Sequence, residues 1–156
     1  MKEIILEQRI MEVQFDELSA DDRELVERAI EATGRSYAVY SHFCVGAALR
    51  LDNGEIVIGC NQENASFPVG ICAERAALFA AGSSYPDVAV HSLAIAARNA
   101  GGLLSEPVSP CGICRQAIVE TEVRFCHPVR LLLYGARRIY IAESVKALLP
   151  LTFSEV

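Results

Sequence analysis

Three cysteines and one glutamate are the residues of this sequence best suited to chemistry. Cys72 and Glu74 belong to a short Cys-Ala-Glu-Arg run, and Cys111 and Cys114 belong to a Pro-Cys-Gly-Ile-Cys run. Structural zinc sites have four protein ligands, whereas catalytic sites keep one position open for water. Three thiolates with a nearby carboxylate therefore predict a zinc ion that activates water. Glu74 is placed to transfer the proton, first as a base and then as an acid.

The same residues allow a structural interpretation. A Cys-x-x-Cys pair also occurs in redox motifs and in structural zinc sites. A fourth ligand from His42, His91, His127 or another cysteine would close the coordination shell. Glu74 would then be only an acidic residue favoured by the dipole of a helix N terminus. In that case the protein would be a non-catalytic, zinc-stabilised binding module.

Both cysteine runs are predicted to begin helices directly after loops, over residues 72–81 and 111–122, with Gly82 ending the first. Helix N termini present free N–H groups and a positive dipole end, which favour a thiolate over a thiol. A zinc ion with three thiolates carries a formal negative charge. Arg75 and Arg115, each beside a ligand-bearing turn, are therefore predicted to donate hydrogen bonds to the sulfurs.

The rest of the hydrophobic pattern predicts a mixed sheet. Five strands are expected, over residues 45–51, 55–60, 89–97, 129–134 and 138–142. The turns at 52–54 and 135–137 are short, so they join the first pair and the last pair as antiparallel hairpins. A helix is predicted from Ser19, its N-cap, to Thr33, just before Gly34. These elements indicate an α/β fold, a mixed five-stranded sheet with helices packed on it.

Size, composition and charge restrict the possible partners. With 156 residues, of which 52% are apolar, the chain is most simply one domain over 1–156. Residues 1–15 are interpreted as a possible N-terminal extension that adds a strand. The net charge of −6 disfavours nucleic acid as a partner. The sequence lacks the patterns of a signal peptide and of a membrane span, so a cytoplasmic protein is expected.

The remaining cysteines are not assigned to the metal. Thiols stay reduced in the cytoplasm, so an even number of cysteines does not by itself indicate disulfides. Cys44, Cys60 and Cys126 lie within or beside apolar stretches. They are predicted to be buried and to behave as small hydrophobic residues.

Five ordered motifs resemble those of the zinc-dependent cytidine deaminases. They are YSHFCVGAA at 40–48, GCNQENAS at 59–66, CAER at 72–75, SPCGICRQ at 109–116, and LLP at 148–150 with Phe153. The cysteine motifs also match the general pattern of nucleobase deaminases, an x-Glu segment followed by Pro-Cys-x-x-Cys. The resemblance runs from about residue 20 to the end of the sequence. It implies the three-layer fold of that family, with helices on both faces of the sheet.

The resemblance implies an enzyme of pyrimidine salvage that hydrolyses cytidine and deoxycytidine to uridine and deoxyuridine plus ammonia. Cys72, Cys111 and Cys114 would bind zinc, and Glu74 would carry protons while the activated water attacks C4 of the base. The expected substrate contacts are Asn61 and Glu63 to the ribose 3′-hydroxyl, Phe43 beside the base, and the Ala73 N–H to the base carbonyl.

The family resemblance also implies a homotetramer. Phe67 and Phe153 would each reach into the site of a neighbouring subunit, although by residue type alone both would be core residues. Phe67 stands where a tyrosine is common in the family. Cys72 and Cys111 are 39 positions apart, which is longer than expected. The surplus is assigned to a flexible loop at 99–104.

Two other classes of deaminase are alternatives. Blasticidin-type and other small-molecule aminopyrimidine deaminases share the zinc motifs, but they resemble this chain less over residues 61–64. Polynucleotide deaminases usually have histidine as the first ligand and a basic face. The acidic net charge of −6 does not fit the latter class.

Overall fold

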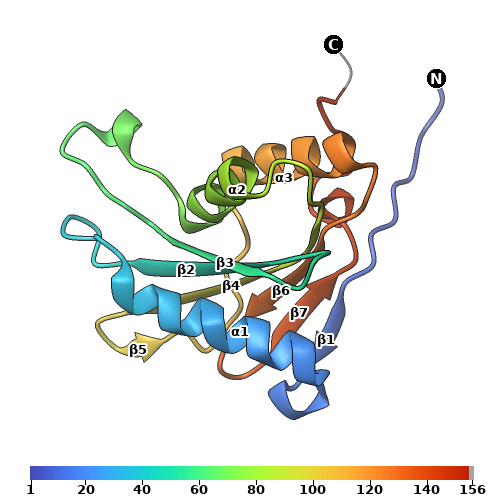
Figure 1. Cartoon of the computed structure of the whole chain (residues 1–156). Helices are drawn as coiled ribbons and strands as arrows, with labels where there is room; N and C mark the ends of the chain where they lie inside the picture. Colours follow the sequence, from blue (N-terminus) through green and yellow to red (C-terminus); the bar gives the residue numbers. More distant parts are fainter. Residues whose placement is uncertain (155–156) are drawn as a thin grey trace.

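Seven strands form one mixed sheet in the computed structural model, which describes residues 1–154 (Figure 1). The strands are β1 (Met11–Val13), β2 (Cys44–Leu51), β3 (Ile56–Cys60), β4 (Val90–Asn99), β5 (Gly102–Leu103), β6 (Arg130–Tyr134) and β7 (Ile139–Ala142). Their order across the sheet is β1-β7-β6-β4-β2-β3, and β5 pairs with the C-terminal end of β4. The pair β4–β6 is parallel, and the other pairs are antiparallel.

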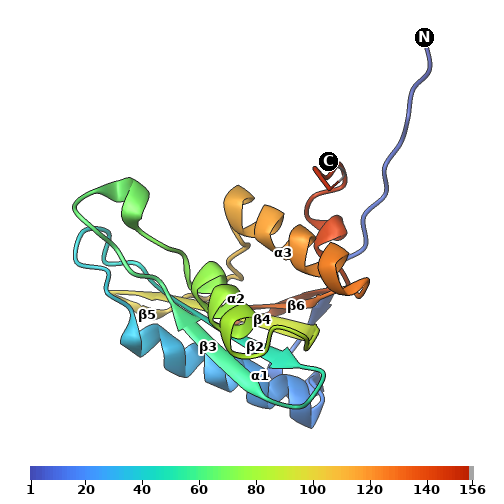
Figure 2. The same cartoon turned by 45° about the horizontal axis from the view of Figure 1, so that its top comes forward.

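Helices cover both faces of the sheet (Figure 2). Helix α1 (Ala20–Ala32) lies on one face, and α2 (Ala73–Ser84) and α3 (Gly112–Phe125) lie on the other. Successive side chains of a strand point to opposite faces. In β2, therefore, Ala47 and Leu49 pack with α2 and α3, and Ala48 packs with α1. The structure thus confirms the predicted three-layer α/β arrangement.

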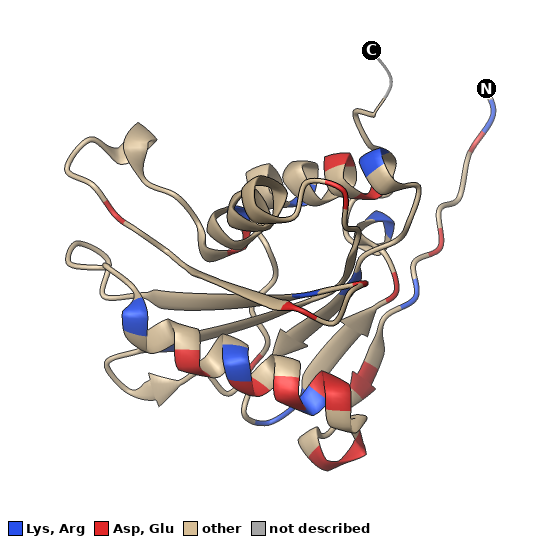
Figure 3. Cartoon of the chain, in the orientation of Figure 1, with Lys and Arg blue, Asp and Glu red and all other residues tan. Residues whose placement is uncertain are grey.

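Helix α1 has one apolar face and one charged face, which fits its position against the sheet. Leu25, Val26 and Ala29 are fully buried against the sheet. Acidic and basic residues occupy its outer face (Figure 3). The Ser19 side chain caps the helix by accepting a hydrogen bond from the Asp22 N–H at 3.1 Å, as predicted. No helix among residues 1–154 is both long enough and apolar enough to span a membrane.

α1 ends at Ala32 with Thr33 as its C-cap, within one residue of the predicted end, and Gly34 lies in the 3-10 turn (Thr33–Arg35) that follows. Gly82 was misassigned as a helix end, because α2 continues through it to Ser84. A glycine within a helix costs only about 1 kcal/mol relative to alanine. The packing of α2 on the sheet, which extends to the buried Ala81, outweighs that cost.

The five predicted strands are present, and the sheet has two more. β1 pairs with β7 through the register Met11 to Ile141 and Val13 to Ile139, which confirms an added N-terminal strand. β5 forms within the segment 99–104, where a flexible loop was predicted. Its turn uses Gly102 at φ 103°, a conformation that glycine adopts without the steric cost of a side chain.

The three cysteines assigned to the core are not buried. Cys44 and Cys60 are partly exposed, and Cys126 is exposed. Cys44 and Cys60 lie at strand ends, where the chain leaves the covered part of the sheet. Cys126 is the C-cap of α3 and has the left-handed φ of 50°. The stretch after Cys44 is buried from Gly46 to Leu49, whereas the strand that ends at Cys60 is only partly buried and Val123 beside Cys126 is 45% exposed.

Candidate active site

Three sulfur atoms converge where α2 and α3 begin. Cys72 and Cys111 are the N-caps of these helices, and Cys114 lies in the first turn of α3. The three Sγ atoms lie within 4.8 Å of one another, and those of Cys72 and Cys111 are 3.8 Å apart. In a tetrahedral zinc site with Zn–S bonds of about 2.3 Å, neighbouring sulfurs lie roughly 3.8 Å apart. The cluster therefore has the donor type and the spacing that zinc requires.

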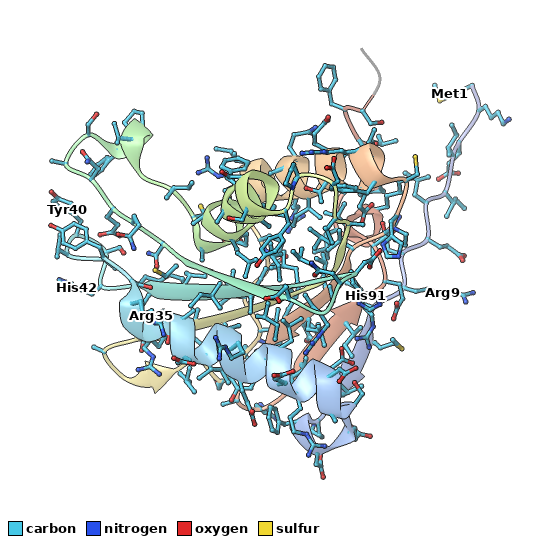
Figure 4. All side chains as sticks on the ribbon, viewed as in Figure 1. Met1, Arg9, Arg35, Tyr40, His42 and His91 are labelled. Carbon is cyan, nitrogen blue, oxygen red and sulfur yellow. The ribbon has the colours of Figure 1, made fainter. Side chains whose placement is uncertain are left out.

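Within residues 1–154, no histidine, carboxylate or further cysteine joins the three sulfurs as a fourth potential ligand. Figure 4 shows His42 in the loop before β2 and His91 near the opposite end of the sheet. His127 follows the C terminus of α3, whereas the sulfurs are at its N terminus. The described part of the chain therefore offers no fourth protein ligand that would complete a structural zinc site. Three ligands leave one position for water.

Hydrogen bonds within the cluster favour a thiolate at Cys72. The contact with Cys114 is the largest of several that lower the pKa of Cys72 from 9.0 to about 5, and Arg75 also contributes. The same contact with Cys72, together with burial, raises the pKa of Cys114. Cys72 is therefore already a thiolate at neutral pH, and the other two thiols would lose their protons when a divalent cation binds.

The two arginines beside the cluster have different partners. Arg75 Nη2 lies 4.0 Å from Cys72 Sγ, as predicted. Arg115 donates instead to the Pro110 carbonyl at 2.9 Å and the Leu148 carbonyl at 2.6 Å, and also to the Ser109 hydroxyl. The predicted bond from Arg115 to a sulfur is therefore wrong. Its guanidinium therefore connects the turn that carries Cys111 to the segment around Leu148.

Glu74 is a buried carboxyl group in the first turn of α2. Only 4% of the surface of Glu74 is exposed. Burial is the main cause that raises the pKa of Glu74, and the neighbouring Cys72 thiolate raises it further. A carboxyl group whose pKa is raised toward neutrality exchanges protons more readily at neutral pH than an ordinary one. The environment of Glu74 therefore suits proton transfer better than a purely helix-capping role.

The sulfurs and Glu74 face a cavity of 590 Å³. It is bounded by the loop before β2, the segment from β3 to α2, and the turn before α3. Among the residues predicted to contact substrate, the cavity is lined by Phe43, Asn61, Glu63, Phe67 and Ala73. The structure thus brings together residues that are up to 72 positions apart in the sequence, from Ser41 at one wall to Ile113 at the other.

Asn61 and Glu63 hold the loop that forms one wall of the cavity. Asn61 Oδ1 accepts from the Val45 N–H at 2.7 Å, and its Nδ2 donates to the Phe43 carbonyl at 2.9 Å. The Glu63 carboxylate accepts from the Tyr40 N–H at 2.8 Å and from the hydroxyl of Ser41. These bonds, with that of Ser41 the largest, lower the pKa of Glu63.

Sequence reasoning missed Ser41. Its hydroxyl donates to Glu63 and accepts from the Phe43 N–H at 3.1 Å, so it links the carboxylate to the wall of the cavity. Ser41 lies within the recognised run at 40–48, which was the available signal. Its partner is 22 positions away, so the pairing could not be inferred from local pattern.

The two aromatic residues expected to reach another subunit are both exposed. Phe67 is 78% exposed and lies at the rim of the cavity, with its ring 6.2 Å from that of Tyr40 in an edge-on arrangement. Phe153 is 70% exposed and is not among the residues that line the cavity. Gln116 Nε2 donates to the Phe153 carbonyl at 2.7 Å and so positions its backbone near α3.

This chain is similar in sequence to known cytidine deaminases. The family model described as the cytidine and deoxycytidylate deaminase zinc-binding region matches residues 19–127. The cytidine deaminase of Sporosarcina psychrophila is 36% identical over 143 residues, which cover 86% of this chain and 93% of that protein. The cytidine deaminase of Halalkalibacterium halodurans is 42% identical over 100 residues, covering 64% of this chain and 71% of that protein.

Solved structures agree with the sequence relatives. The crystal structure of cytidine deaminase from Burkholderia pseudomallei superimposes with a TM-score of 0.71 at 34% identity, covering 83% of this chain and 97% of that chain. The matched family region includes β2 to α3 and hence all three clustered sulfurs and Glu74. With its zinc-compatible sulfurs inside that region, this chain belongs to the cytidine and deoxycytidylate deaminase family, and its cofactor is zinc.

Proposed function

We propose that this protein is a zinc-dependent hydrolase that converts cytidine and deoxycytidine to uridine and deoxyuridine with release of ammonia. The observation that carries the proposal is the trio of sulfurs at zinc-compatible spacing, which shares a 590 Å³ cavity with the buried Glu74. The relatives from Sporosarcina and Halalkalibacterium are both cytidine deaminases. Their similarity favours a pyrimidine nucleoside over other aminopyrimidines.

In this proposal Cys72, Cys111 and Cys114 hold the zinc ion. Zinc supplies Lewis acidity, which makes a water molecule a stronger nucleophile near neutral pH. Glu74 would take one proton from the attacking water and pass it to a ring nitrogen of the base. It would then carry the second proton of that water to the amino group, which leaves as ammonia. Its burial supports this role, because the raised pKa keeps the protonated form accessible. Arg75 stabilises the Cys72 thiolate through the contact of 4.0 Å.

The nucleoside would be held by groups around the cavity. Phe43 would flank the base, and the N–H of Ala73 would donate to the base carbonyl. Asn61 and Glu63 would bind the ribose 3′-hydroxyl. An amide offers two donors and two lone pairs, and a carboxylate offers about four lone-pair sites. Both side chains therefore keep hydrogen-bonding capacity beyond their bonds to the loop at 40–45.

We further propose a homotetramer in which neighbouring subunits complete each site. The exposure of Phe67 at the cavity rim and of Phe153 outside this chain's own cavity supports a role in another subunit's site. The proposal also covers a single deaminase domain over 1–156 and a cytoplasmic role in pyrimidine salvage.

The test is turnover by the purified zinc-loaded protein. Incubation with cytidine should lower the ultraviolet absorbance of the cytosine ring and release one ammonia per uridine formed. Blasticidin S is tested in parallel, and little or no turnover is expected with it. Turnover of blasticidin S without turnover of cytidine would refute the nucleoside assignment. Inertness toward both compounds, with zinc bound, would refute the enzymatic role.

A further inference from the structure

Residues 1–10 form an exposed arm that leaves the sheet at β1. All ten residues are exposed, and none belongs to a helix or strand (Figure 1). Several of them are large apolar residues. Ile4 and Ile5 are 75% and 78% exposed, and Leu6 and Ile10 are 51% and 45% exposed. Such a concentration of apolar side chains in water is a surface that favours association.

The arm continues an edge strand of the sheet. β1 pairs with β7 on one side only and stands at the end of the strand order. Its other edge therefore presents unpaired backbone N–H and C=O groups, which are a template for another strand. Met11, the first residue of β1, pairs with Ile141, and β7 ends one residue later at Ala142. The arm that precedes Met11 therefore extends past the end of β7.

The arm also carries the pattern of a two-sided strand. Alternate residues of an extended chain share a face. Ile4, Leu6 and Ile10 share one face with Gln8, and Ile5 shares the other face with Glu7 and Arg9. Figure 3 shows charges of both signs along the arm. An extended segment with apolar and charged positions arranged in this way is suited to pair with a strand.

We propose that the arm pairs antiparallel with the arm of a second copy of this chain, about a two-fold axis at Gln8. In this register the residue numbers of two directly opposed residues, one from each copy, add up to 16. Glu7 then faces the partner's Arg9, and Arg9 faces the partner's Glu7. The two ion pairs flank the axis symmetrically, as an isologous interface requires.

The same register pairs the apolar residues. Leu6 faces the partner's Ile10, and Ile5 faces the partner's Met11, each twice by symmetry. Ile4 faces the partner's Glu12 and lies diagonal to the partner's Ile10. Directly opposed side chains of an antiparallel pair interact most strongly, and diagonal ones still make contact. A register shifted by two residues one way places Glu7 opposite another Glu7. The same shift the other way places Glu7 opposite Met11 and Arg9 opposite another Arg9. Charge and hydrophobic complementarity thus select the register centred on Gln8.

Disulfide trapping tests the pairing directly. Directly opposed residues in antiparallel strands have Cα atoms about 4.5–5.5 Å apart, which is within the range for a disulfide. Gln8→Cys in the zinc-loaded protein should form a covalent dimer under mild oxidation. Leu6→Cys is the matched control, because its two copies would lie roughly 14 Å apart along the strands. The wild-type protein under the same oxidant controls for its own exposed cysteines.

Charge reversal tests the register in the Gln8→Cys background. Glu7→Arg and Arg9→Glu should each slow dimer formation about tenfold, because both ion pairs become like-charge pairs. The double variant restores opposite charges and should recover the original rate. Glu7→Arg makes the surroundings of the new thiol more positive, and Arg9→Glu makes them more negative. A slower rate of dimer formation in both variants therefore cannot come from a change in thiol reactivity.

Cytidine turnover should be unaffected in all of these variants, because the arm lies outside the cavity. If Gln8→Cys forms no more dimer than the wild type, the proposal is overturned. It is also overturned if Leu6→Cys cross-links as fast as Gln8→Cys, or if the double variant remains as slow as the single ones. Cross-linking is read on denaturing gels, so the test does not depend on whether the remainder of the chain forms a tetramer.

Discussion

Gly59 in β3 lies directly against Ala73 at the start of α2. A β-carbon on Gly59 would stand 2.4 Å from the Ala73 carbonyl oxygen and 2.4 Å from the Ala77 N–H nitrogen. Both contacts are with backbone atoms, so neither can rotate away. The absence of a side chain at Gly59 therefore lets the helix that begins at Cys72 approach the sheet.

The first prediction concerns this contact. Gly59→Ala should lower the free energy of unfolding by about 1–3 kcal/mol, as overpacking does, and should weaken zinc retention because α2 must move. Gly34→Ala is the control, since nothing lies within 4 Å of its β-carbon position. Denaturant unfolding and bound zinc are measured for both variants. An unchanged Gly59→Ala protein would show that α2 does not depend on this close approach.

The second prediction concerns the sulfurs. Serine in place of Cys72, Cys111 or Cys114 should remove most bound zinc and abolish turnover, because three ligands are the minimum for a catalytic zinc site. Cys126→Ser should retain both zinc and activity, since Cys126 caps the opposite end of α3. Zinc is measured by elemental analysis of the purified proteins. Full zinc content in any of the three variants would remove that cysteine from the ligand set.

The third prediction separates zinc binding from proton transfer. Glu74→Gln keeps the size of the side chain but cannot take up a proton. The variant should retain zinc, and kcat for cytidine should fall by about 10²–10⁴, the usual contribution of general acid–base catalysis. Metal analysis and ammonia release are measured on the same sample. A zinc-loaded Glu74→Gln enzyme with near-normal kcat would exclude Glu74 as the proton carrier.

The fourth prediction uses the pKa of Cys72. In protein from which zinc has been removed by a chelator, the Cys72 thiolate should persist down to a pH of about 5. Its alkylation by iodoacetamide should therefore decline only as the pH falls through that value. Arg75→Gln removes one stabilising contact and should shift this midpoint upward. Peptide mass spectrometry gives the rate at each pH. A midpoint near the ordinary thiol value of about 8.5 would contradict the prediction.

The fifth prediction concerns a buried carboxylate away from the cavity. Glu122 accepts from the backbone N–H groups of Val129 at 2.9 Å and Val145 at 3.0 Å, and from the Ser144 hydroxyl. Glu122→Ala should lower the free energy of unfolding by about 3 kcal/mol, because two buried donors lose their acceptor. Glu120→Ala, an exposed position on the same helix, should change it little. Chemical denaturation compares the two, and equal stabilities would rule out this role.

Much of the fold could be predicted because its signals are local. The Asp-Asn-Gly turn requires a left-handed residue, and Gly54 adopts a φ of 88° there. The hydrogen bond from the Leu51 N–H to the Glu55 carbonyl, at 2.9 Å, closes the hairpin. Ser19 caps α1 through a contact only three residues away. In each case the residues that decide the structure are neighbours in the sequence.

The features that could not be predicted depend on distant partners. An added N-terminal strand was predicted, but its partner was not, because β1 is held by β7, about 130 positions later in the chain, as in the register Met11 to Ile141. Arg115 was expected at a sulfur, but its partner Leu148 is 33 positions away. The role of Ser41 depends in the same way on Glu63. No local pattern specifies which of several nearby acceptors a long side chain will reach.

The bonds of Arg115 have a consequence for the order in which the protein is made. The turn that carries Cys111 is held by a guanidinium whose other anchor is the Leu148 carbonyl. During synthesis this anchor is absent until the chain has been extended to Leu148, 37 positions beyond Cys111. The turn that carries Cys111 therefore gains its full set of hydrogen bonds only after α3, β6 and β7 have been made.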